Sequence, residues 1–275
     1  MADLKRLSVN QVTVLPQWTL SQCIDGLVRN GVPAISVWRE KLLELGVAEA
    51  ARQLDGAGLA VSGLCFAGLI ASPDAGEAAK ALDDVKRAID EAAAIKAQCL
   101  VFVAGPVDPR DKNVKATRAR ALERVATLIP AARAAKVKIA LEPLHPMACA
   151  TRSVISNIKI ANDWCDTLRA DDVFGIAIDT YVVWWDPEVE EQIARAGKRI
   201  CAFHVNDWLV DTKDLRLDRG MMGDGVIDIP SIRRMIEKAG YDGYIEVEVF
   251  SERNWWKRDP DEVVRVVKER FQSAV

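Results

Sequence analysis

The chain has 275 residues, half of them hydrophobic, and its 40 acidic and 37 basic side chains leave a formal net charge of -3. This length suits one large domain or two small ones, and single barrels commonly reach it. The slight acidic excess gives no electrostatic reason to expect binding to nucleic acid or to an anionic membrane surface.

The N-terminus contains no apolar core of a secretory signal, and no run of about 18 apolar residues occurs anywhere in the chain. We therefore expect no membrane span and a cytoplasmic protein. The six cysteines form no CxxC pair and lie mostly in apolar segments. This distribution favours buried, reduced thiols over a zinc or disulfide framework.

Apolar runs of strand length alternate with amphipathic stretches along the chain. Strands are predicted to start at Leu7, Ala34, Ala60, Cys99, Lys138, Phe174, Ile200 and Tyr244. Helices are predicted around 20–30, 42–56, 77–96, 115–135, 154–168, 189–196, 229–239 and 261–271. Because no composition shift separates these β-then-α units, they predict one catalytic α/β domain over residues 1–275, a (β/α)8 TIM barrel.

An open, doubly wound sheet is the alternative fold for such a pattern. Its nucleotide-binding forms carry a glycine-rich phosphate loop after the first strand. Neither GxGxxG nor GxxxxGK[ST] follows the first predicted strand here. The barrel is therefore favoured.

Four residues with metal-binding side chains close the last four predicted strands: Glu142, Asp179, His204 and Glu248. The C-terminal ends of parallel barrel strands meet at one rim, so these side chains can surround one point. An acidic residue after a strand is common and can simply be a capped or ion-paired loop residue. Four in succession, rich in oxygen, predict a site for Mn²⁺ or Mg²⁺.

Two glutamates on the last strand compete for the fourth ligand position. Glu246 and Glu248 point to the same side because they are two residues apart. We assign Glu248 as the ligand because it lies nearer the rim, and we expect Glu246 to lie deeper, as a supporting or structural carboxylate. The chain has only two histidines, His145 and His204, and both fall on the predicted rim.

Several segments resemble the xylose-isomerase-like barrel superfamily of sugar isomerases and epimerases, which includes hydroxypyruvate isomerases and ketose 3-epimerases. The segments are 140–143 (ALEP), 178–180 (IDT), 203–207 (FHVND), 223–228 (GDGVID) and 240–244 (GYDGY) leading into Glu248. The resemblance implies the same metal ligands: Glu142, Asp179, His204 and Glu248. It also implies a small-molecule sugar or glycoside as the substrate.

Two positions depart from the common pattern of these families. His145 stands where they usually carry Asn, and Val182 stands where they usually carry His. Segments 142–147 (EPLHPM) and 36–40 (SVWRE) resemble instead the large subunit of bacterial C-glycoside deglycosidases. That resemblance implies a 3-keto glycoside substrate, a catalytic base at His145, and a separate small β subunit that completes a hetero-oligomer.

The chemistry common to these enzymes starts at a ketone, whose α-hydrogens become acidic when its oxygen binds a divalent cation. His145, with an ordinary pKa of about 6.5, could remove such a proton near neutral pH. Elimination would then cleave the C–C glycosidic bond of a C-glycoside, which makes a metal-dependent carbon–carbon lyase the leading hypothesis. The alternative is a sugar isomerase or epimerase that transfers protons through Glu142 and Glu248. A loop histidine that caps a helix is the plain reading of His145.

Other residues near strand ends are candidates for substrate binding, namely Glu40, Arg152, Asp207 and Trp184. Each has a plain structural alternative: a solvated charge for Glu40, a surface ion pair for Arg152, a supporting acceptor for Asp207, and core packing or a partner interface for Trp184. Lys213, Arg216 and Arg219 lie in a long loop that could form a lid, although solvated charge is the simpler interpretation.

Two further classes of function are disfavoured. A repair endonuclease of the related barrel family needs more metal-binding histidines and a basic face. A non-catalytic binding barrel is expected to have lost its metal ligands, and all four candidates are present here.

Overall fold

The computed structural model describes residues 2–275 and contains eight parallel strands that close into a barrel in chain order, with β8 pairing with β1. The strands are β1 (Leu7–Asn10), β2 (Ala34–Trp38), β3 (Ala60–Gly68), β4 (Cys99–Val103), β5 (Lys138–Leu141), β6 (Phe174–Asp179), β7 (Ile200–Val205) and β8 (Ile245–Val247). The predicted TIM barrel is confirmed. The predicted strand starts agree with the observed ones except at β8, which begins one residue after Tyr244.

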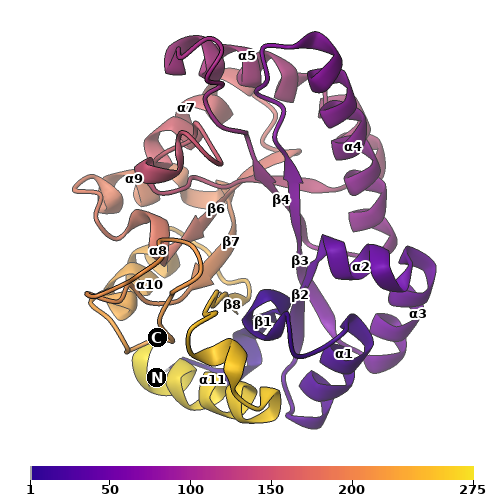
Figure 1. Cartoon of the computed structure of the whole chain (residues 1–275), viewed down its shortest axis with the longest axis vertical. Helices are drawn as coiled ribbons and strands as arrows, with labels where there is room; N and C mark the ends of the chain where they lie inside the picture. Colours follow the sequence, from indigo (N-terminus) through magenta and orange to yellow (C-terminus); the bar gives the residue numbers. More distant parts are fainter. Residues whose placement is uncertain (1) are drawn as a thin grey trace.

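The helices surround the barrel on the outside (Figure 1). They are α1 (Leu20–Arg29), α2 (Arg39–Leu45), α3 (Val47–Ala57), α4 (Ala75–Ala94), α5 (Val114–Ala126), α6 (Ile129–Ala135), α7 (Ile158–Leu168), α8 (Thr180–Val183), α9 (Val189–Ala196), α10 (Ile229–Lys238) and α11 (Pro260–Ala274). No helix among the described residues is both long and apolar enough to cross a membrane.

Two stretches that the sequence predicts as single helices are each split in two. Gly46 separates α2 from α3 and has a φ of 91°, which side chains with a Cβ rarely adopt. Between α5 and α6 the chain breaks at Thr127 and Leu128, just before Pro130. Proline lacks the N–H that a continuous helix needs, but it is tolerated in the first turn of a new one.

The core has two parts, one between the strands and the helices and one inside the barrel. The inner part is built largely from small side chains, among them Cys99, Ala140, Ala177 and Ala202. Because strand side chains alternate between the two faces, the residue two positions after each of these alanines also points inward. Those residues are Glu142, Asp179 and His204, three of the four predicted metal ligands.

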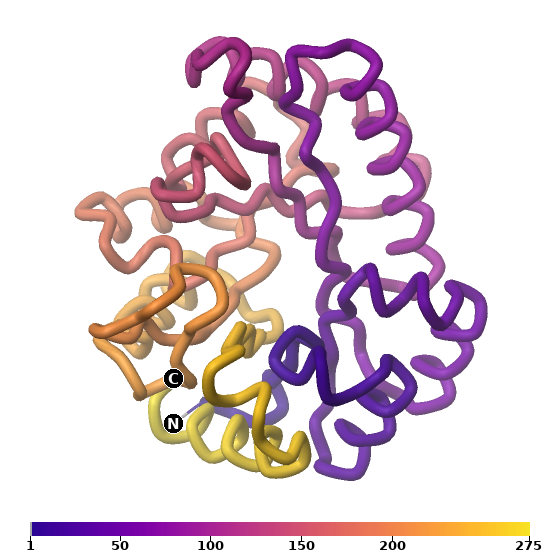
Figure 2. Tube along the Cα trace, viewed as in Figure 1, coloured from indigo at the N-terminus to yellow at the C-terminus, as the bar shows by residue number. Residues whose placement is uncertain are grey.

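The two ends of the chain lie side by side (Figure 2). β1 pairs with β8 through Ser8 and Glu246, and α11 packs against the turn that precedes β1. Closure of the barrel therefore depends on contacts between the two ends of the sequence, and it sets Glu248 beside the first strand.

Arg39 is the first residue of α2 and ties that helix to α4. Its guanidinium donates to Asp84 at 2.5 Å and to Glu91 at 2.6 Å, and its side chain is only 12% exposed. Hydrogen bonding and the charges of these two carboxylates raise the pKa of Arg39, although burial opposes that rise. We predict that Arg39→Ala lowers the free energy of unfolding by roughly 2–4 kcal/mol, because it leaves the carboxylate of Glu91, whose side chain is only 11% exposed, without its partner.

Urea denaturation of the wild type and the variant measures this loss. Arg52→Ala, which breaks an exposed pair with Glu49 within α3, is the matched control and should leave the midpoint unchanged. Equal midpoints for Arg39→Ala and Arg52→Ala would show that the pairing of α2 with α4 adds nothing to stability.

Candidate active site

The predicted metal ligands meet at the C-terminal end of the barrel. One ligand atom from each of Glu142, Asp179, His204 and Glu248 lies within 4.8 Å of the others. Asp179 and His204 belong to β6 and β7, Glu142 follows β5, and Glu248 follows β8. All four are buried, with at most 7% of any residue exposed. The structure therefore brings together the whole set that the strand ends suggested.

The imidazole of His204 lies among the carboxylates. Its Nδ1 is 3.2 Å from Glu142 Oε1 and 4.0 Å from Glu248 Oε2, and its Nε2 is 3.5 Å from Glu246 Oε1. Within the described residues neither nitrogen makes a hydrogen bond of good geometry. A fully buried imidazole whose Nδ1 faces two carboxylate oxygens without bonding to them is arranged as a metal ligand.

The electrostatics of this cluster call for positive charge. Burial lowers the pKa of His204, but Glu246, Glu142 and Glu248 outweigh it and raise the pKa well above its usual value. Burial also raises the pKa of Glu248 to about 8, although His204 and Arg219 act in the opposite direction. The His204 shift reflects the negative charge of the carboxylates around it, and the Glu248 shift reflects chiefly the lack of water around its carboxylate. The donor set and its charge therefore fit a divalent cation.

Neighbouring side chains hold the ligands in place. Asp179 Oδ1 accepts from Asn206 Nδ2 at 2.8 Å and from the backbone N–H of Tyr181 at 2.9 Å. Asn10 Nδ2 donates to Glu246 at 2.7 Å and to Glu248 at 3.1 Å. Glu246 lies one layer deeper than Glu248 and also accepts from Ser62 Oγ at 2.9 Å. Such contacts fix which carboxylate oxygens remain free for an ion.

Arg219 is the main member of the site that the sequence did not single out. Its Nη1 donates to Asp179 at 2.9 Å and to Glu248 at 3.0 Å, and the residue is only 8% exposed. Its guanidinium also stacks on Tyr181 and Phe250, 4.5 and 4.6 Å from the ring centroids. The interpretation of this residue as a solvated loop charge is wrong. Nothing in the local sequence separates it from its neighbours Lys213 and Arg216, which are exposed.

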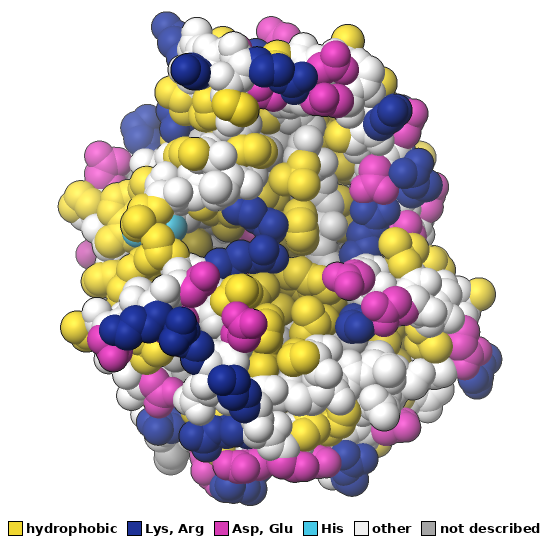
Figure 3. Space-filling model, in the orientation of Figure 1, with side chains coloured by type: hydrophobic (Ala, Val, Ile, Leu, Met, Phe, Trp, Pro, Cys, Tyr) yellow, Lys and Arg dark blue, Asp and Glu magenta, His cyan; other side chains and the backbone are white. Residues whose placement is uncertain are grey.

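A cavity of about 590 Å³ opens above the cluster and is lined by Glu142, Glu248, Arg219 and His145 together with apolar side chains. On the surface it is a hollow with lysine or arginine side chains at its centre and hydrophobic side chains around them (Figure 3). Its volume lies within the usual range of small-molecule sites. The sides include the aromatic residues Trp38, Phe66 and Phe250.

His145 lies on the wall of this cavity and also caps the 3-10 helix Pro146–Ala148. Its Nδ1 accepts from the backbone N–H of Met147 at 3.3 Å. Its ring packs against Trp185 and Trp208, with centroids 5.5 and 5.3 Å away. Burial lowers the pKa of His145, so the ring is neutral near pH 7. With Nδ1 accepting, that neutral ring carries its proton on Nε2.

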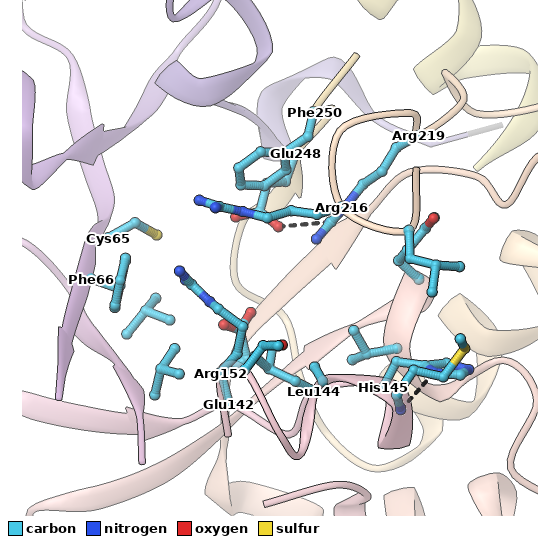
Figure 4. A pocket seen from close by; sticks show the side chains of 18 of the residues that line it. Cys65, Phe66, Glu142, Leu144, His145, Arg152, Arg216, Arg219, Glu248 and Phe250 are labelled. Carbon is cyan, nitrogen blue, oxygen red and sulfur yellow. Dashed lines mark hydrogen bonds and ion pairs between the residues drawn. The ribbon is translucent and has the colours of Figure 1, made fainter. Parts of the chain in front are cut away.

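The four substrate-binding candidates lie in different places. Arg152 lines the cavity, with its guanidinium 4.8 Å from the centroid of Phe66 (Figure 4). Glu40 is exposed on α2 and is not part of the cavity lining. Trp184 is partly buried behind the wall, 5.7 Å from Trp208 between ring centroids. Asp207 is buried and holds the loop that follows β7.

Asp207 fixes this loop, residues 208–227, by accepting four backbone hydrogen bonds at 2.9–3.0 Å. The donors are the N–H groups of Trp208, Gly223, Gly225 and Ile227. Gly225 packs so closely on the carbonyl of Trp208 that a Cβ there would lie 2.1 Å from that oxygen. The same loop carries Arg216 and Arg219 into the site, so its shape decides where their charges lie.

We predict that Mn²⁺ at about 100 times its dissociation constant raises the melting temperature of the chelated protein by roughly 5 °C. Asp179→Asn should lose this increase because it removes a charged ligand. Asp186→Asn, which changes a buried carboxylate outside the cluster, should retain the Mn²⁺-induced rise in melting temperature. A thermal melt with and without Mn²⁺ measures the effect, and an undiminished increase in Asp179→Asn would contradict the ligand assignment.

We also predict that Asp207→Ala exposes the loop to proteases, because four backbone N–H groups lose their acceptor at a cost of roughly 2–4 kcal/mol. Limited proteolysis with mapped fragments measures this, and we expect cleavage within 208–227. Asp211→Ala, which changes an exposed carboxylate on the same loop, is the control. Identical cleavage patterns for the two variants would show that Asp207 does not fix the loop.

Solved structures of other proteins are similar to this chain and share its barrel fold. Protein SMc04130 from Sinorhizobium meliloti 1021 is 47% identical over 99% of both chains, with a TM-score of 0.96. The IOLI protein, solved with a bound zinc atom, is 19% identical over 98% of both chains, with a TM-score of 0.86. The 3-keto-D-glucoside 4-epimerase YcjR from E. coli is 15% identical over 98% of this chain and 100% of that one, with a TM-score of 0.76.

At these low identities the last two structures show a shared fold only. No curated protein matches the chain in sequence. The family model of the xylose isomerase-like TIM barrel, in contrast, matches residues 25–270, which is most of the chain. The chain belongs to the xylose isomerase-like TIM barrel family.

Proposed function

We propose that this protein is a divalent-metal-dependent enzyme that enolises a keto sugar, with Glu142 and Glu248 as the proton-transferring pair. One observation carries the proposal. The two carboxylates follow separate strands, β5 and β8, belong to the same cluster of possible metal ligands, and line the same cavity. Two carboxyl groups on one substrate site can remove a proton at one position and return it at another.

A divalent cation, Mn²⁺ or Mg²⁺, held by Glu142, Asp179, His204 and Glu248 would polarise the substrate carbonyl and acidify the adjacent C–H. Side chains of the protein would transfer the proton and limit the access of water. Each carboxylate has two oxygens, so Glu142 and Glu248 can hold the ion through one and face the substrate with the other. The apolar side chains above them limit the access of water to the reacting carbons.

The position of His145 favours isomerase or epimerase chemistry over elimination. With Nδ1 engaged by Met147, the neutral ring keeps its Nε2–H as the remaining hydrogen-bond donor of a residue that lines the cavity. To act as a base it would first have to give up that capping bond. We therefore propose His145 as a donor to a substrate oxygen, and we leave proton transfer to the two glutamates. The 3-keto-D-glucoside substrate of YcjR, a protein of the same fold, supports a keto sugar.

Cleavage of a C-glycoside is the second candidate, and the cavity favours it. A volume of about 590 Å³ with Trp38, Phe66 and Phe250 on its walls has room for a sugar ring and an aromatic substituent. In this reaction His145, released from Met147, would be the base that starts elimination from a 3-keto glycoside. A small β subunit would then be the partner, as the resemblance of segment 142–147 implies.

We predict that the Mn²⁺-loaded enzyme exchanges an α-hydrogen of a keto sugar for deuterium in D₂O. Glu142→Gln and Glu248→Gln should each reduce this exchange by roughly 100-fold or more, because a general acid–base group is removed. His145→Gln should retain most of it. Mass spectrometry of the recovered sugar measures the exchange, and Mn²⁺ affinity is measured in parallel to separate loss of metal from loss of the proton-transferring group.

The same assay separates the two candidates. Incubation with a 3-keto C-glucoside should give deuterated sugar without release of the aglycone if the enzyme is an isomerase or epimerase. Aglycone release that depends on His145 would establish the lyase instead. A fully active Glu248→Gln variant would contradict the carboxylate pair.

A further inference from the structure

We infer that the substrate carries an anionic group, a carboxylate in preference to a phosphate, and that this group binds between Arg152 and Arg216. The inference rests on the proposed function, because it names the class of keto sugar that the site would enolise: a keto sugar acid. It arises from two guanidinium groups in the cavity that the metal cluster does not need.

Both arginines line the cavity above the cluster, and the acidic groups near their guanidinium groups act only through space, Glu142 and Glu248 on Arg152 and Asp214 on Arg216. Among residues 2–275, no carboxylate forms an ion pair with Arg152 or Arg216, and neither guanidinium donates a hydrogen bond. Arg219, in the same loop as Arg216, is paired with Asp179 and Glu248. All three arginines line the cavity, but only Arg219 is held by carboxylates of the cluster.

The two guanidinium groups also approach each other. Arg152 extends from the loop after β5 and Arg216 from the loop after β7, and their ends reach the same side of the pocket in Figure 4. Burial lowers the pKa of Arg152, and the charge of Arg216 lowers it further. Glu142 and Glu248 partly offset this effect on Arg152. The two like charges, Arg152 partly buried and Arg216 at the exposed mouth of the cavity, still repel each other, and an anion between them would relieve that repulsion.

The carboxylates of the metal cluster do not fully neutralise the positive charges of Arg152 and Arg216. Glu142, Asp179, Glu246 and Glu248 bring four negative charges, and a divalent cation together with Arg219 matches three of them when His204 is neutral. With Arg152 and Arg216 added, the site with its metal has a surplus of one positive charge. A neutral sugar would leave that surplus unmatched, whereas an anionic group would form charge-assisted hydrogen bonds with it.

A carboxylate fits this position better than a phosphate. Phosphate sites usually recruit backbone N–H groups from glycine-rich loops or helix N-termini. Here the N–H groups of Arg152 and Ser153 already donate to the carbonyl of Ala148, at 2.7 and 3.2 Å. With these backbone donors engaged, the guanidinium groups of Arg152 and Arg216 are the charged donors available to the anion, and their planar forks match a carboxylate.

The test is equilibrium binding of three unreactive probes to the Mn²⁺-loaded full-length protein: D-glucuronate, D-glucose 6-phosphate and D-glucose. Isothermal titration should show glucuronate binding at least about tenfold more tightly than glucose, which is the effect of one charge-assisted contact. Arg152→Gln and Arg216→Gln should each remove most of that preference. Lys213→Gln, which changes an exposed cation of the same loop outside the cavity lining, should keep it.

The Mn²⁺ affinity of each variant is measured first, because a carboxylate probe can also bind the metal. A preference for the phosphate probe that depends on both arginines would support the anion site and replace the carboxylate assignment. Equal binding of charged and neutral probes would overturn the inference, and so would a preference that survives in both arginine variants. The proposed function is tested separately, by deuterium exchange into neutral ketoses. If the anion site fails but this exchange is observed, only the inference about the substrate's charge is overturned.

Discussion

Repulsion among buried carboxylates constrains the rest of this structure. Glu142, Asp179 and Glu248 place ligand oxygens within 4.8 Å of one another with little solvent around them. Each pair of such charges costs roughly 4 kcal/mol at 4 Å with an effective dielectric constant of 20. Positive charge must therefore lie among them. Arg219 supplies one such charge through its contacts with Asp179 and Glu248, and the surrounding carboxylates raise the pKa of His204.

The barrel makes this arrangement possible by alternating small and polar side chains on its inner face. Ala140, Ala177 and Ala202 lie two residues before Glu142, Asp179 and His204, so a small side chain lies below each of these ligands. On β8 the corresponding position is Glu246 instead. Its carboxylate is held by Asn10 and Ser62 and faces the second nitrogen of His204. The last strand thus joins the ligand cluster to a polar network on β1 and β3.

The sequence predicted much of this because the relevant signals are local. Apolar runs mark the strands, and the residue after each run is expected at the barrel rim, so the clustering of Glu142, Asp179, His204 and Glu248 could be predicted from spacing. The split helices are also local in origin, but Gly46 and Pro130 fall inside otherwise helical patterns, where a single glycine or proline is often tolerated. The chemistry assigned to His145 depends on which ring nitrogen is free, and spacing does not report that.

Arg219 and Asp207 could not be assigned in the same way because the loop after β7 determines what they contact. A basic residue in a polar loop is usually solvated, and only the folded path of residues 208–227 brings Arg219 to Asp179, 40 positions earlier in the chain. The path in turn depends on the four backbone hydrogen bonds that Asp207 accepts. One buried carboxylate that touches neither the cluster nor the cavity therefore decides where two arginine charges lie.

Because Asp207 fixes the loop that carries both Arg216 and Arg219, it links the metal cluster to substrate recognition. Arg219 and Arg216 are three residues apart on one fixed loop and both line the cavity, but only Arg219 is paired with Asp179 and Glu248. A divalent ion among the carboxylates would weaken the hold of Asp179 and Glu248 on Arg219, since the ion competes for the same oxygens. The positive charge of the loop would then become more available to a substrate, so metal binding and recognition of an anionic sugar would reinforce each other through the loop that Asp207 fixes.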